Sequence, residues 1–297
     1  MTVKQYEVLH RASLFLVKHA REPKVAEILL QHHLQVSRAA FYSMMQEPVP
    51  ETIIKQFETD IKKHAETGIP LQHLVGTAEF YGRNFIVNGN VLVPRMETEE
   101  LVQHVISKVE NIKPSLEKVE KQADSSLKIV DIGTGSGIIA ISLKLELEGV
   151  QIFATDISAE ALKIAKQNAQ QLNADITFLQ GDFLNPFMKQ NIKADVIVSN
   201  PPYIAKREKA LLADTVKDFE PEMALFADEN GLLAYRKIIE QAKSAIKENG
   251  HLVFEIGHEQ GKAVEQLIKQ AYPHSAIKII KDINGKDRIV SAKLSAE

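Results

Sequence analysis

Leu127-Lys-Ile-Val-Asp-Ile-Gly-Thr-Gly-Ser-Gly137 is the stretch that decides the fold of this 297-residue chain. Its first six residues form a mainly apolar run typical of a buried strand, and the three glycines that follow are typical of a tight turn. Residues 138–147 then repeat apolar side chains at helical spacing. We therefore predict a strand, a glycine turn and a helix, in which the turn lets a ligand approach the backbone closely.

Strand and helix patterns alternate through the rest of the chain, which predicts an α/β fold with helices on both faces of a parallel sheet. Further strands are expected at 151–155, 176–180, 195–199 and 251–256, and helices at 159–172, 232–247 and 261–271. Residues 276–281 and 288–293 also read as strands, and the turn between them is too short for a parallel crossover. We expect a Rossmann-like, mostly parallel sheet of about seven strands that closes with an antiparallel hairpin.

The first seventy or so residues show helical periodicity only, which predicts a small all-α domain over residues 1–75. That domain either supports the fold or recognises the substrate. Asn88-Gly89 stands between two β-rich runs and predicts a β-hairpin, so residues 76–96 are expected to be a hairpin linker. The remaining residues, 97–297, form the expected larger domain.

Composition narrows the class of protein. The chain is 44% apolar and 25% charged, carries a formal charge of -3, and contains no cysteine. The charge argues against a surface dedicated to nucleic acid, and the missing cysteines exclude disulfides and thiolate chemistry. No apolar stretch reaches membrane-spanning length, and no signal-peptide core is present. We expect a cytoplasmic protein without membrane contact and, since the histidines are scattered, without a metal site.

Asn200-Pro201-Pro202-Tyr203 follows the strand expected at 195–199, at the strand end where open α/β sheets bind their ligands. Two prolines remove backbone donors, so the turn presents mainly carbonyl acceptors. The Asn side chain adds an acceptor and the Tyr adds a flat ring. Such a pocket suits a planar nitrogen group, either a carboxamide or the exocyclic amine of a base, and we expect it to be the catalytic site.

Asp156 ends the next expected strand, twenty-one residues after Gly135, where a carboxylate can accept hydrogen bonds from both hydroxyls of a ribose. The glycine turn is therefore interpreted as a nucleoside site. Residues 135–140 also satisfy the dinucleotide pattern G-x-G-x-x-A, which keeps NAD as an alternative. Asp131 favours S-adenosylmethionine instead, because its carboxylate can face an ammonium group that a pyrophosphate lacks. The acceptor turn at Asn200 favours it too, since hydride transfer does not need one.

Asp182 and Phe183 follow the third strand and form the last candidate contact with a nucleoside. An acid and an aromatic ring at this place can hydrogen-bond the adenine amine and cover the face of the base. An exposed acid beside a core aromatic residue explains the pair nearly as well.

Many motifs of this chain closely resemble those of the release-factor glutamine N5-methyltransferases, the HemK/PrmC family, which are class I methyltransferases. The resemblance covers residues 70–290 and is looser before them. It is carried by Pro70–Gly76, Glu79–Gly82, Val93–Arg95, Glu97–Leu101, Asp131–Gly137, Asn200–Ile204, Glu220–Pro221, Ala224–Phe226, Gly231–Leu232, Tyr235–Arg236, Glu255–Gly257, Gln260–Gly261 and Asp287–Arg288. One departure is Met96, where the family usually has proline, and it is expected to loosen the entry to the next helix.

The resemblance implies a methyl transfer from S-adenosylmethionine to the Gln of the Gly-Gly-Gln loop of peptide chain release factors. It assigns the cofactor to Gly133, Thr134, Gly135, Ser136, Gly137, Asp156, Asp182 and Phe183. We expect Asp131 and Asn200 to be cofactor-binding residues as well. The resemblance assigns the substrate glutamine to Asn200, Pro201, Pro202 and Tyr203. A monomer without stable nucleic-acid binding is expected.

Other readings of the acceptor turn remain open. Amino-methyltransferases of adenine or guanine in nucleic acid share Asn-Pro-Pro-Tyr, and would stack Tyr203 on a flipped base. A sister glutamine methyltransferase of a ribosomal protein would use the same chemistry. A non-catalytic cofactor-binding protein is a third possibility. Residues 204–230 form a long connection, which we expect to be a lid or binding loop for the substrate.

Overall fold

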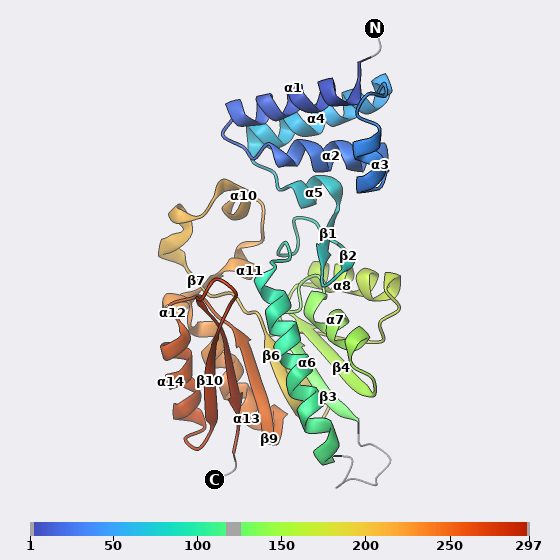
Figure 1. Cartoon of the computed structure of the whole chain (residues 1–297). Coiled ribbons are helices and arrows are strands. Elements are labelled where there is room, and N and C mark those ends of the chain that lie inside the picture. Colours follow the sequence, from blue (N-terminus) through green and yellow to red (C-terminus); the bar gives the residue numbers. More distant parts are fainter. Residues whose placement is uncertain (1–2, 117–125, 296–297) are drawn as a thin grey trace. The chain divides into compact units, whose positions relative to one another are not determined.

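The computed structural model describes residues 3–116 and 126–295 (Figure 1). The chain divides into two compact units. One holds residues 1–77 together with the short segment 213–219, and the other holds residues 78–212 and 220–297. Within the described ranges, no helix is both long and apolar enough to cross a membrane.

The first unit is helical, as its periodicity predicts. It contains α1 (Gln5–Lys18), α2 (Lys24–Leu34), α3 (Arg38–Ser43), α4 (Glu51–Thr67), α5 (Leu71–Val75) and, from far along the chain, α10 (Asp214–Lys217). Leu16, Leu30, Phe41 and Phe57 are fully buried in its core, one or more from each of the four longer N-terminal segments. Their burial explains why the apolar residues recur at helical spacing.

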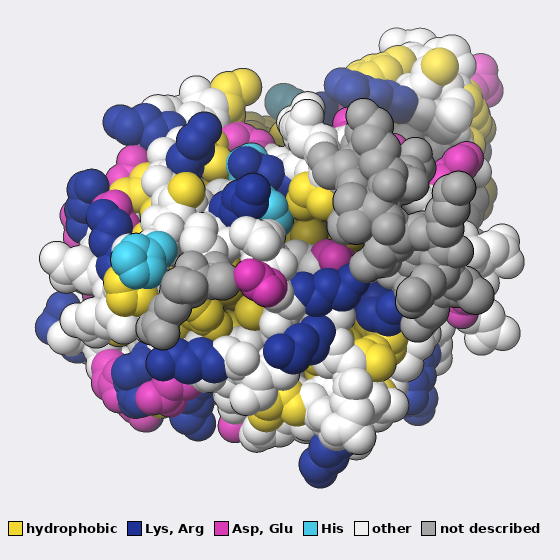
Figure 2. All heavy atoms as spheres, turned by 90° about the horizontal axis from the view of Figure 1, so that it is seen from below, with side chains coloured by type: hydrophobic (Ala, Val, Ile, Leu, Met, Phe, Trp, Pro, Cys, Tyr) yellow, Lys and Arg dark blue, Asp and Glu magenta, His cyan; other side chains and the backbone are white. Residues whose placement is uncertain are grey.

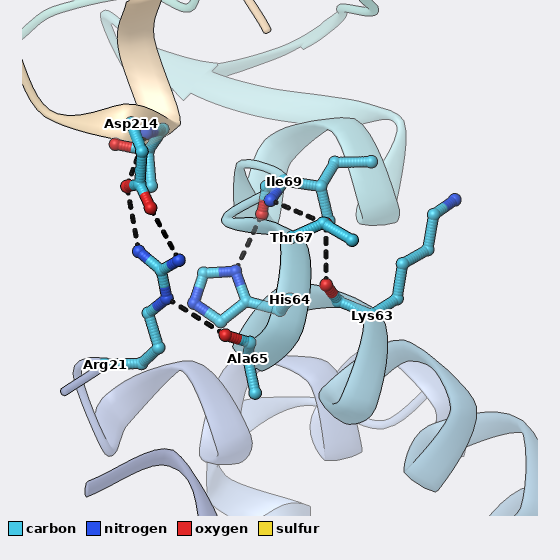
Figure 3. Close-up of polar contacts among 8 residues, drawn as sticks. Arg21, Lys63, His64, Ala65, Thr67, Ile69 and Asp214 are labelled. Carbon is cyan, nitrogen blue, oxygen red and sulfur yellow. Dashed lines mark hydrogen bonds and ion pairs between the residues drawn. The ribbon is translucent and has the colours of Figure 1, made fainter. Parts of the chain in front are cut away.

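Asp214 joins the helical unit through a two-pronged ion pair (Figure 3). Arg21 Nη1 and Nη2 donate to Asp214 Oδ1 and Oδ2 over 2.8 and 2.7 Å, which is the bidentate geometry of strong Arg–carboxylate pairs. The hydrogen bond from Arg21 lowers the pKa of the Asp214 carboxyl to about 2. Arg21 Nε also donates to the Ala65 carbonyl, which places the pair against the end of α4. The segment 213–219 is therefore fastened to the helical unit by charge as well as by packing.

The second unit is built on one seven-stranded sheet, as predicted. Its strands are β3 (Leu127–Ile132), β4 (Val150–Asp156), β5 (Thr177–Gln180), β6 (Ala194–Ser199), β9 (Ile246–Glu255), β10 (Ala276–Lys281) and β11 (Asp287–Lys293). They lie in the order β10-β11-β9-β6-β3-β4-β5. The pairs among β3, β4, β5, β6 and β9 are parallel, and β11 runs antiparallel to both of its neighbours. The closing antiparallel hairpin is thereby confirmed.

Both faces of this sheet are covered by helices (Figure 1). The residues of each central strand alternate between two cores, so that Ile129 packs in one and Val130 in the other. One core lies under α6 (Glu97–Leu116), α7 (Ile138–Glu146) and α8 (Ala159–Gln171), and the other under α9 (Asn185–Met188), α13 (Leu233–Ala245) and α14 (Gly261–Ala271). Burial on both sides explains why the strands read as apolar runs instead of alternating patterns.

The predicted hairpin exists, but its turn lies elsewhere. Strands β1 (Thr77–Phe80) and β2 (Arg83–Ile86) are joined by Tyr81-Gly82, not by Asn88-Gly89. Tyr81 and Gly82 both have positive φ angles (50° and 69°), as a two-residue hairpin turn requires. The backbone N–H of Tyr81 donates to Glu99 Oε1 over 2.7 Å, a contact from a distant residue. Asn88-Gly89 forms a separate turn in which the Asn88 side chain accepts from the Asn90 N–H.

Two histidines lie between α6 and the sheet with ring nitrogens that have no partner in the described part of the chain, Nε2 of His104 and Nδ1 of His251. Burial is the main cause that lowers the pKa of each to about 4, with smaller contributions from the charges of Lys108 and Lys278 at His104 and of Lys108 and Lys293 at His251. Elsewhere on the surface, basic side chains are interspersed with acidic and hydrophobic ones, as Figure 2 shows for one face.

The folded protein is therefore expected to lose stability in acid through His251. Its pKa lies below the ordinary value of 6.5, so between pH 6.5 and about 4 the unfolded chain binds more protons than the folded one. The stability is present above this window and is lost as pH falls through it, by roughly 3 kcal/mol at the end. Urea unfolding at several pH values should show a shallower acid loss in His251→Gln. The exposed His274→Gln should retain the full loss, and equal slopes in both variants would contradict the assignment.

Candidate functional site

A cavity of about 330 Å³ opens at the carboxyl ends of the central strands. Its wall is formed by the turn after β3, the end of β4, the turn after β5, the residues after β6, and residues 90–92. A roof from the long connection between β6 and α13 completes it. Binding sites of small molecules typically have volumes of about 300–1,000 Å³, so this one is large enough for a nucleoside-sized ligand.

The glycine turn contributes only part of itself to the cavity. Gly133 and Gly135 line it, and the N–H groups of Gly133 and Thr134 donate to the Thr155 carbonyl, which ties the turn to β4. Thr134 and Ser136 are buried behind the turn. Gly137 lies where α7 begins, and a Cβ there would come within 2.9 Å of the Ile141 side chain. The predicted residues therefore divide into two that face the ligand space and three that shape the turn.

Asp156 ends β4 and lines the cavity, as expected of a residue that holds a ribose. Its Oδ2 accepts from the Gly135 N–H and its Oδ1 from the Ser158 N–H, both over 2.9 Å. Burial raises the pKa of this carboxyl, and the backbone hydrogen bonds lower it in part. A carboxylate has about four acceptor positions, so these hydrogen bonds leave acceptor capacity for a ligand.

Asp131 lies behind the glycine turn, fully buried and outside the cavity lining. Its Oδ2 accepts from Thr134 Oγ1 over 2.6 Å and from the Ala140 N–H over 3.2 Å. Its Oδ1 has no partner within the described residues. Burial raises the pKa of Asp131 to about 7. Any influence on a ligand passes through its charge or through that unpartnered oxygen.

Asp182 and Phe183 both line the cavity after β5, which is the same cavity that Asp156 lines. Lys237, in the first turns of α13, joins them. Its Nζ lies 5.7 Å from the centre of the Phe183 ring and 3.8 Å from Asp182 Oδ2. Lys237 could not be predicted from the sequence, since a lysine in a surface helix has no distinguishing signal until the fold brings it here.

The acceptor turn lies at the end of β6, as predicted. Asn200 and Pro202 line the cavity, Pro201 is buried, and Tyr203 lies outside the lining. Tyr203 is held through its backbone, because Gln260 Nε2 donates to its carbonyl over 2.9 Å. Burial raises the pKa of the Tyr203 phenol to about 12. The hydroxyl therefore stays protonated at neutral pH.

The long connection after β6 forms the cavity roof. It contains β7 (Ile204–Ala205), the 3₁₀ helix η1 (Lys206–Leu211), α11 (Glu222–Leu225), β8 (Phe226–Ala227) and α12 (Asp228–Gly231), and β7 pairs in parallel with β8. Lys206, Met223 and Phe226 are among the residues that face the cavity. The expectation of a loop over the ligand space agrees with this placement.

An ion pair fixes the point where this roof returns from residues 213–219. Arg95 Nη2 donates to Glu220 Oε1 over 2.6 Å, and the Glu220 side chain is almost fully buried. Burial raises the pKa of Glu220, while Arg95 lowers it. Met96, next in the chain, is 81% exposed and α6 begins directly after it, so the entry to the helix forms without the proline.

No group of three or more His, Asp or Glu side chains in residues 3–116 and 126–295 is arranged to hold a metal ion.

Comparison with known proteins identifies the family. Residues 7–76 match the family model "PrmC N-terminal domain" and residues 123–286 match "Methyltransferase domain". A release factor glutamine methyltransferase of Bacillus cereus is 42% identical over 293 residues, which covers 98% of this chain and all of that protein. The enzyme of the same name from Bacillus subtilis is 42% identical over 97% of this chain and 96% of its own. The chain belongs to the release factor glutamine methyltransferase family.

A solved structure of another protein has a fold similar to that of this chain. The catalytic domain of hMettl16, in complex with a hairpin of the MAT2A 3'UTR, covers 83% of this chain and 82% of its own, with a TM-score of 0.53. At 17% identity this likeness establishes the methyltransferase fold and nothing finer. The family recognised from the motifs and the expected class I fold are both confirmed.

Several family motifs without an assigned role meet around the acceptor turn. Gly231 packs so closely that a Cβ there would lie 2.0 Å from the Tyr203 carbonyl oxygen. Tyr235 donates its hydroxyl to the backbone carbonyl of Glu255 over 2.9 Å. These contacts join segments that are distant in sequence, and they surround the turn with rigid supports.

Proposed function

We propose that this family member transfers a methyl group from S-adenosylmethionine to the side-chain amide nitrogen, N5, of the Gln in the Gly-Gly-Gln motif of peptide chain release factors. The observation that carries the proposal is the position of Asn200, whose acceptor turn borders the same cavity as the glycine turn and Asp156. Relatives with 42% identity over nearly the whole chain carry the name of this activity.

The residues of the cavity fit S-adenosylmethionine. Gly133 and Gly135 leave room beside the backbone, since a Cβ on either would meet no atom of the described residues within 4 Å apart from its chain neighbours. Asp156 has acceptor positions left for ribose hydroxyls, and Phe183 offers a ring for the base. The unpartnered, buried Oδ1 of Asp131 supplies negative potential for an ammonium group. When bound, this cofactor supplies an electrophilic methyl group on a positively charged sulfur.

The acceptor turn prepares the glutamine amide for transfer. An amide nitrogen is a poor nucleophile because its lone pair is delocalised into the carbonyl. Asn200 Oδ1 and the Pro201 carbonyl accept hydrogen bonds from its two N–H groups, which fixes the amide plane and the orientation of the nitrogen. Pro202, which lines the cavity next to Asn200, excludes water from it, and Tyr203 supports the turn from outside the lining. Positioning and desolvation therefore carry the catalysis, and the surplus proton leaves to a carbonyl or to water.

The test is transfer of tritiated methyl to a purified release factor, alongside its Gly-Gly-Gln Gln→Ala variant, ribosomal proteins and mixed nucleic acid. Label on the wild-type factor and none on its variant is expected. Label on a ribosomal protein alone, or on nucleic acid alone, would overturn the substrate and favour one of the other amino-methyltransferase readings.

Asp156→Asn is expected to weaken binding of S-adenosylhomocysteine, the product, roughly 10- to 100-fold, because a charged hydrogen bond is worth about 1.5–3 kcal/mol. Asn keeps one acceptor oxygen, so the turn at Gly135 retains support. Calorimetric titration measures the change, and the exposed Asp175→Asn serves as the matched control. Unchanged affinity in Asp156→Asn would mean that the ribose lies elsewhere.

The domain boundaries also belong to this proposal: a helical domain at 1–75, a hairpin linker at 76–96 and a methyltransferase domain at 97–297. The helical domain either docks the release factor or supports the fold. We also predict that the protein is a cytoplasmic monomer that does not bind nucleic acid stably.

A further inference from the structure

A buried chain of hydrogen bonds leads away from Asn200. Its Nδ2 donates to Thr98 Oγ1 over 3.3 Å, and Thr98 Oγ1 donates to Glu255 Oε2 over 2.7 Å. Thr98 lies in the first turn of α6 and is 1% exposed, while Glu255 ends β9 and is 2% exposed. Three elements distant in sequence therefore converge on one side-chain amide.

The donor-to-acceptor direction along these hydrogen bonds is set by which of the three side chains carry protons. An ionised carboxylate only accepts hydrogen bonds, so the single hydroxyl proton of Thr98 points toward Glu255. The Thr98 oxygen then offers only lone pairs to Asn200, which must present its NH₂ group to it. Asn200 Oδ1 accepts no hydrogen bond within residues 3–116 and 126–295, so it is the amide atom left for the cavity.

We infer that Thr98 and Glu255 are positioning residues that hold the Asn200 amide with its nitrogen inward and its oxygen toward the substrate. This inference rests on the proposed function, because it explains how Asn200 becomes an acceptor for a substrate NH₂ group. An asparagine without such a support could present either end, since its amide oxygen and nitrogen differ little in size.

Protonation of Glu255 would allow the direction of these hydrogen bonds to reverse. A carboxylic acid can donate to Thr98 Oγ1, and the Thr98 hydroxyl can then donate to Asn200 Oδ1. The Asn200 NH₂ group would face the NH₂ group of the substrate, donor against donor. Turnover should therefore fall as Glu255 gains its proton.

Several groups from different elements set the charge of Glu255. Its pKa is raised to about 7, mainly by burial and also by the charge of Glu97 of α6, while Thr98, Arg288 of β11 and Asn200 act in the opposite direction. The phenols of Tyr203 and Tyr235 also lie near it, and the same carboxylate contributes to raising the pKa of each. The reversal is thus expected near neutral pH, with the acceptor arrangement present above it and lost below it.

Steady-state kinetics with a release factor test the support. Glu255→Gln is expected to lower kcat roughly 10- to 100-fold, because glutamine can both donate and accept and no longer sets the direction. Thr98→Val should lower kcat similarly, and Thr98→Ser should restore most of it. Affinity for S-adenosylhomocysteine should stay unchanged in all three. Glu248→Gln, an exposed position on the same strand, is the matched control. Wild-type kcat in Glu255→Gln would overturn the inference.

The pH profile separates Glu255 from Asp131, the other buried carboxyl whose pKa is raised to about 7. The wild-type enzyme should lose kcat on the acid side of about pH 7, and Glu255→Gln should show a low rate without this limb. A limb that persists unchanged in Glu255→Gln would belong to Asp131 and would contradict the reversal.

A direct measurement keeps the inference independent of the substrate. The side-chain NH₂ signals of Asn200, identified by their absence in Asn200→Asp, should shift with pH in the wild-type protein with a midpoint near 7, and should not shift so in Glu255→Gln. Signals that do not titrate would overturn the inference even if release factors are methylated. If no release factor is methylated while these signals titrate as expected, the proposed substrate fails and the positioning of Asn200 stands.

Discussion

Replacing Asn200 with alanine is expected to lower turnover roughly 100-fold or more while leaving cofactor affinity nearly unchanged. The side chain supplies one of two acceptors for the substrate amide, and loss of a strong hydrogen-bonding partner costs about 1.5–3 kcal/mol. The lost fixing of the nitrogen adds to this, since misplaced reactants react far more slowly. Single-turnover transfer of labelled methyl and calorimetric titration with S-adenosylhomocysteine measure the two quantities separately.

Asn111→Ala is the matched control for that experiment, because Asn111 is exposed on α6 and, among the described residues, its side chain bonds only to the Ser107 carbonyl. It should leave both quantities unchanged. Full turnover in Asn200→Ala would sink the mechanism, and a loss confined to cofactor affinity would move Asn200 from the substrate to the cofactor.

The second large effect is expected at Gly231, where alanine should destabilise the fold by roughly 2–4 kcal/mol. Its φ angle of +85° disfavours any side chain, and a Cβ would lie 2.0 Å from the Tyr203 carbonyl oxygen and 2.6 Å from Gln260 Nε2. The hydrogen bond between those two atoms must break or move. Turnover should fall as well, because Tyr203 belongs to the acceptor turn. Urea unfolding and the methyl transfer assay measure the two losses.

Gly285→Ala separates the backbone strain of a positive φ angle from the steric clash of the added Cβ. Gly285 has a similar φ angle of +75°, but in the described part of the chain a Cβ there would meet no atom within 4 Å beyond its two neighbours in sequence. This variant should lose only about 1–2 kcal/mol and keep its turnover. Equal losses in the two variants would show that the close contact at Tyr203 has no energetic weight.

Most of the sheet could be predicted because its signals are local. Strands buried on both faces read as apolar runs, and the glycine turn after Ile132 marks the first of them. The hairpin shows where local signals fail. Asn88-Gly89 has the better turn sequence, yet the turn forms at Tyr81, whose backbone N–H donates a hydrogen bond to Glu99, eighteen residues away. A contact of that range has no sequence signal.

The candidate site was predictable to the same extent. Asn200, Asp156 and the glycines stand at strand ends, where topology alone brings residues together. Lys237 and Thr98 could not be found in this way, because both lie in helices, and Thr98 meets Glu255 at the end of β9 across 157 residues of sequence. Thr98 also lies among the acidic residues of the first turn of α6, which the helix dipole explains without any role in the site.

The short segment 213–219 changes how this protein can be taken apart. Because it belongs to the helical unit, the chain crosses from one unit to the other three times, at 77–78, 212–213 and 219–220. A chimera that exchanges only the first seventy-seven residues for those of a relative would leave Asp214 facing a foreign bundle without a matched Arg21. The exchangeable module is discontinuous, so a domain swap must carry both pieces, and a truncation at residue 77 removes only part of the helical unit.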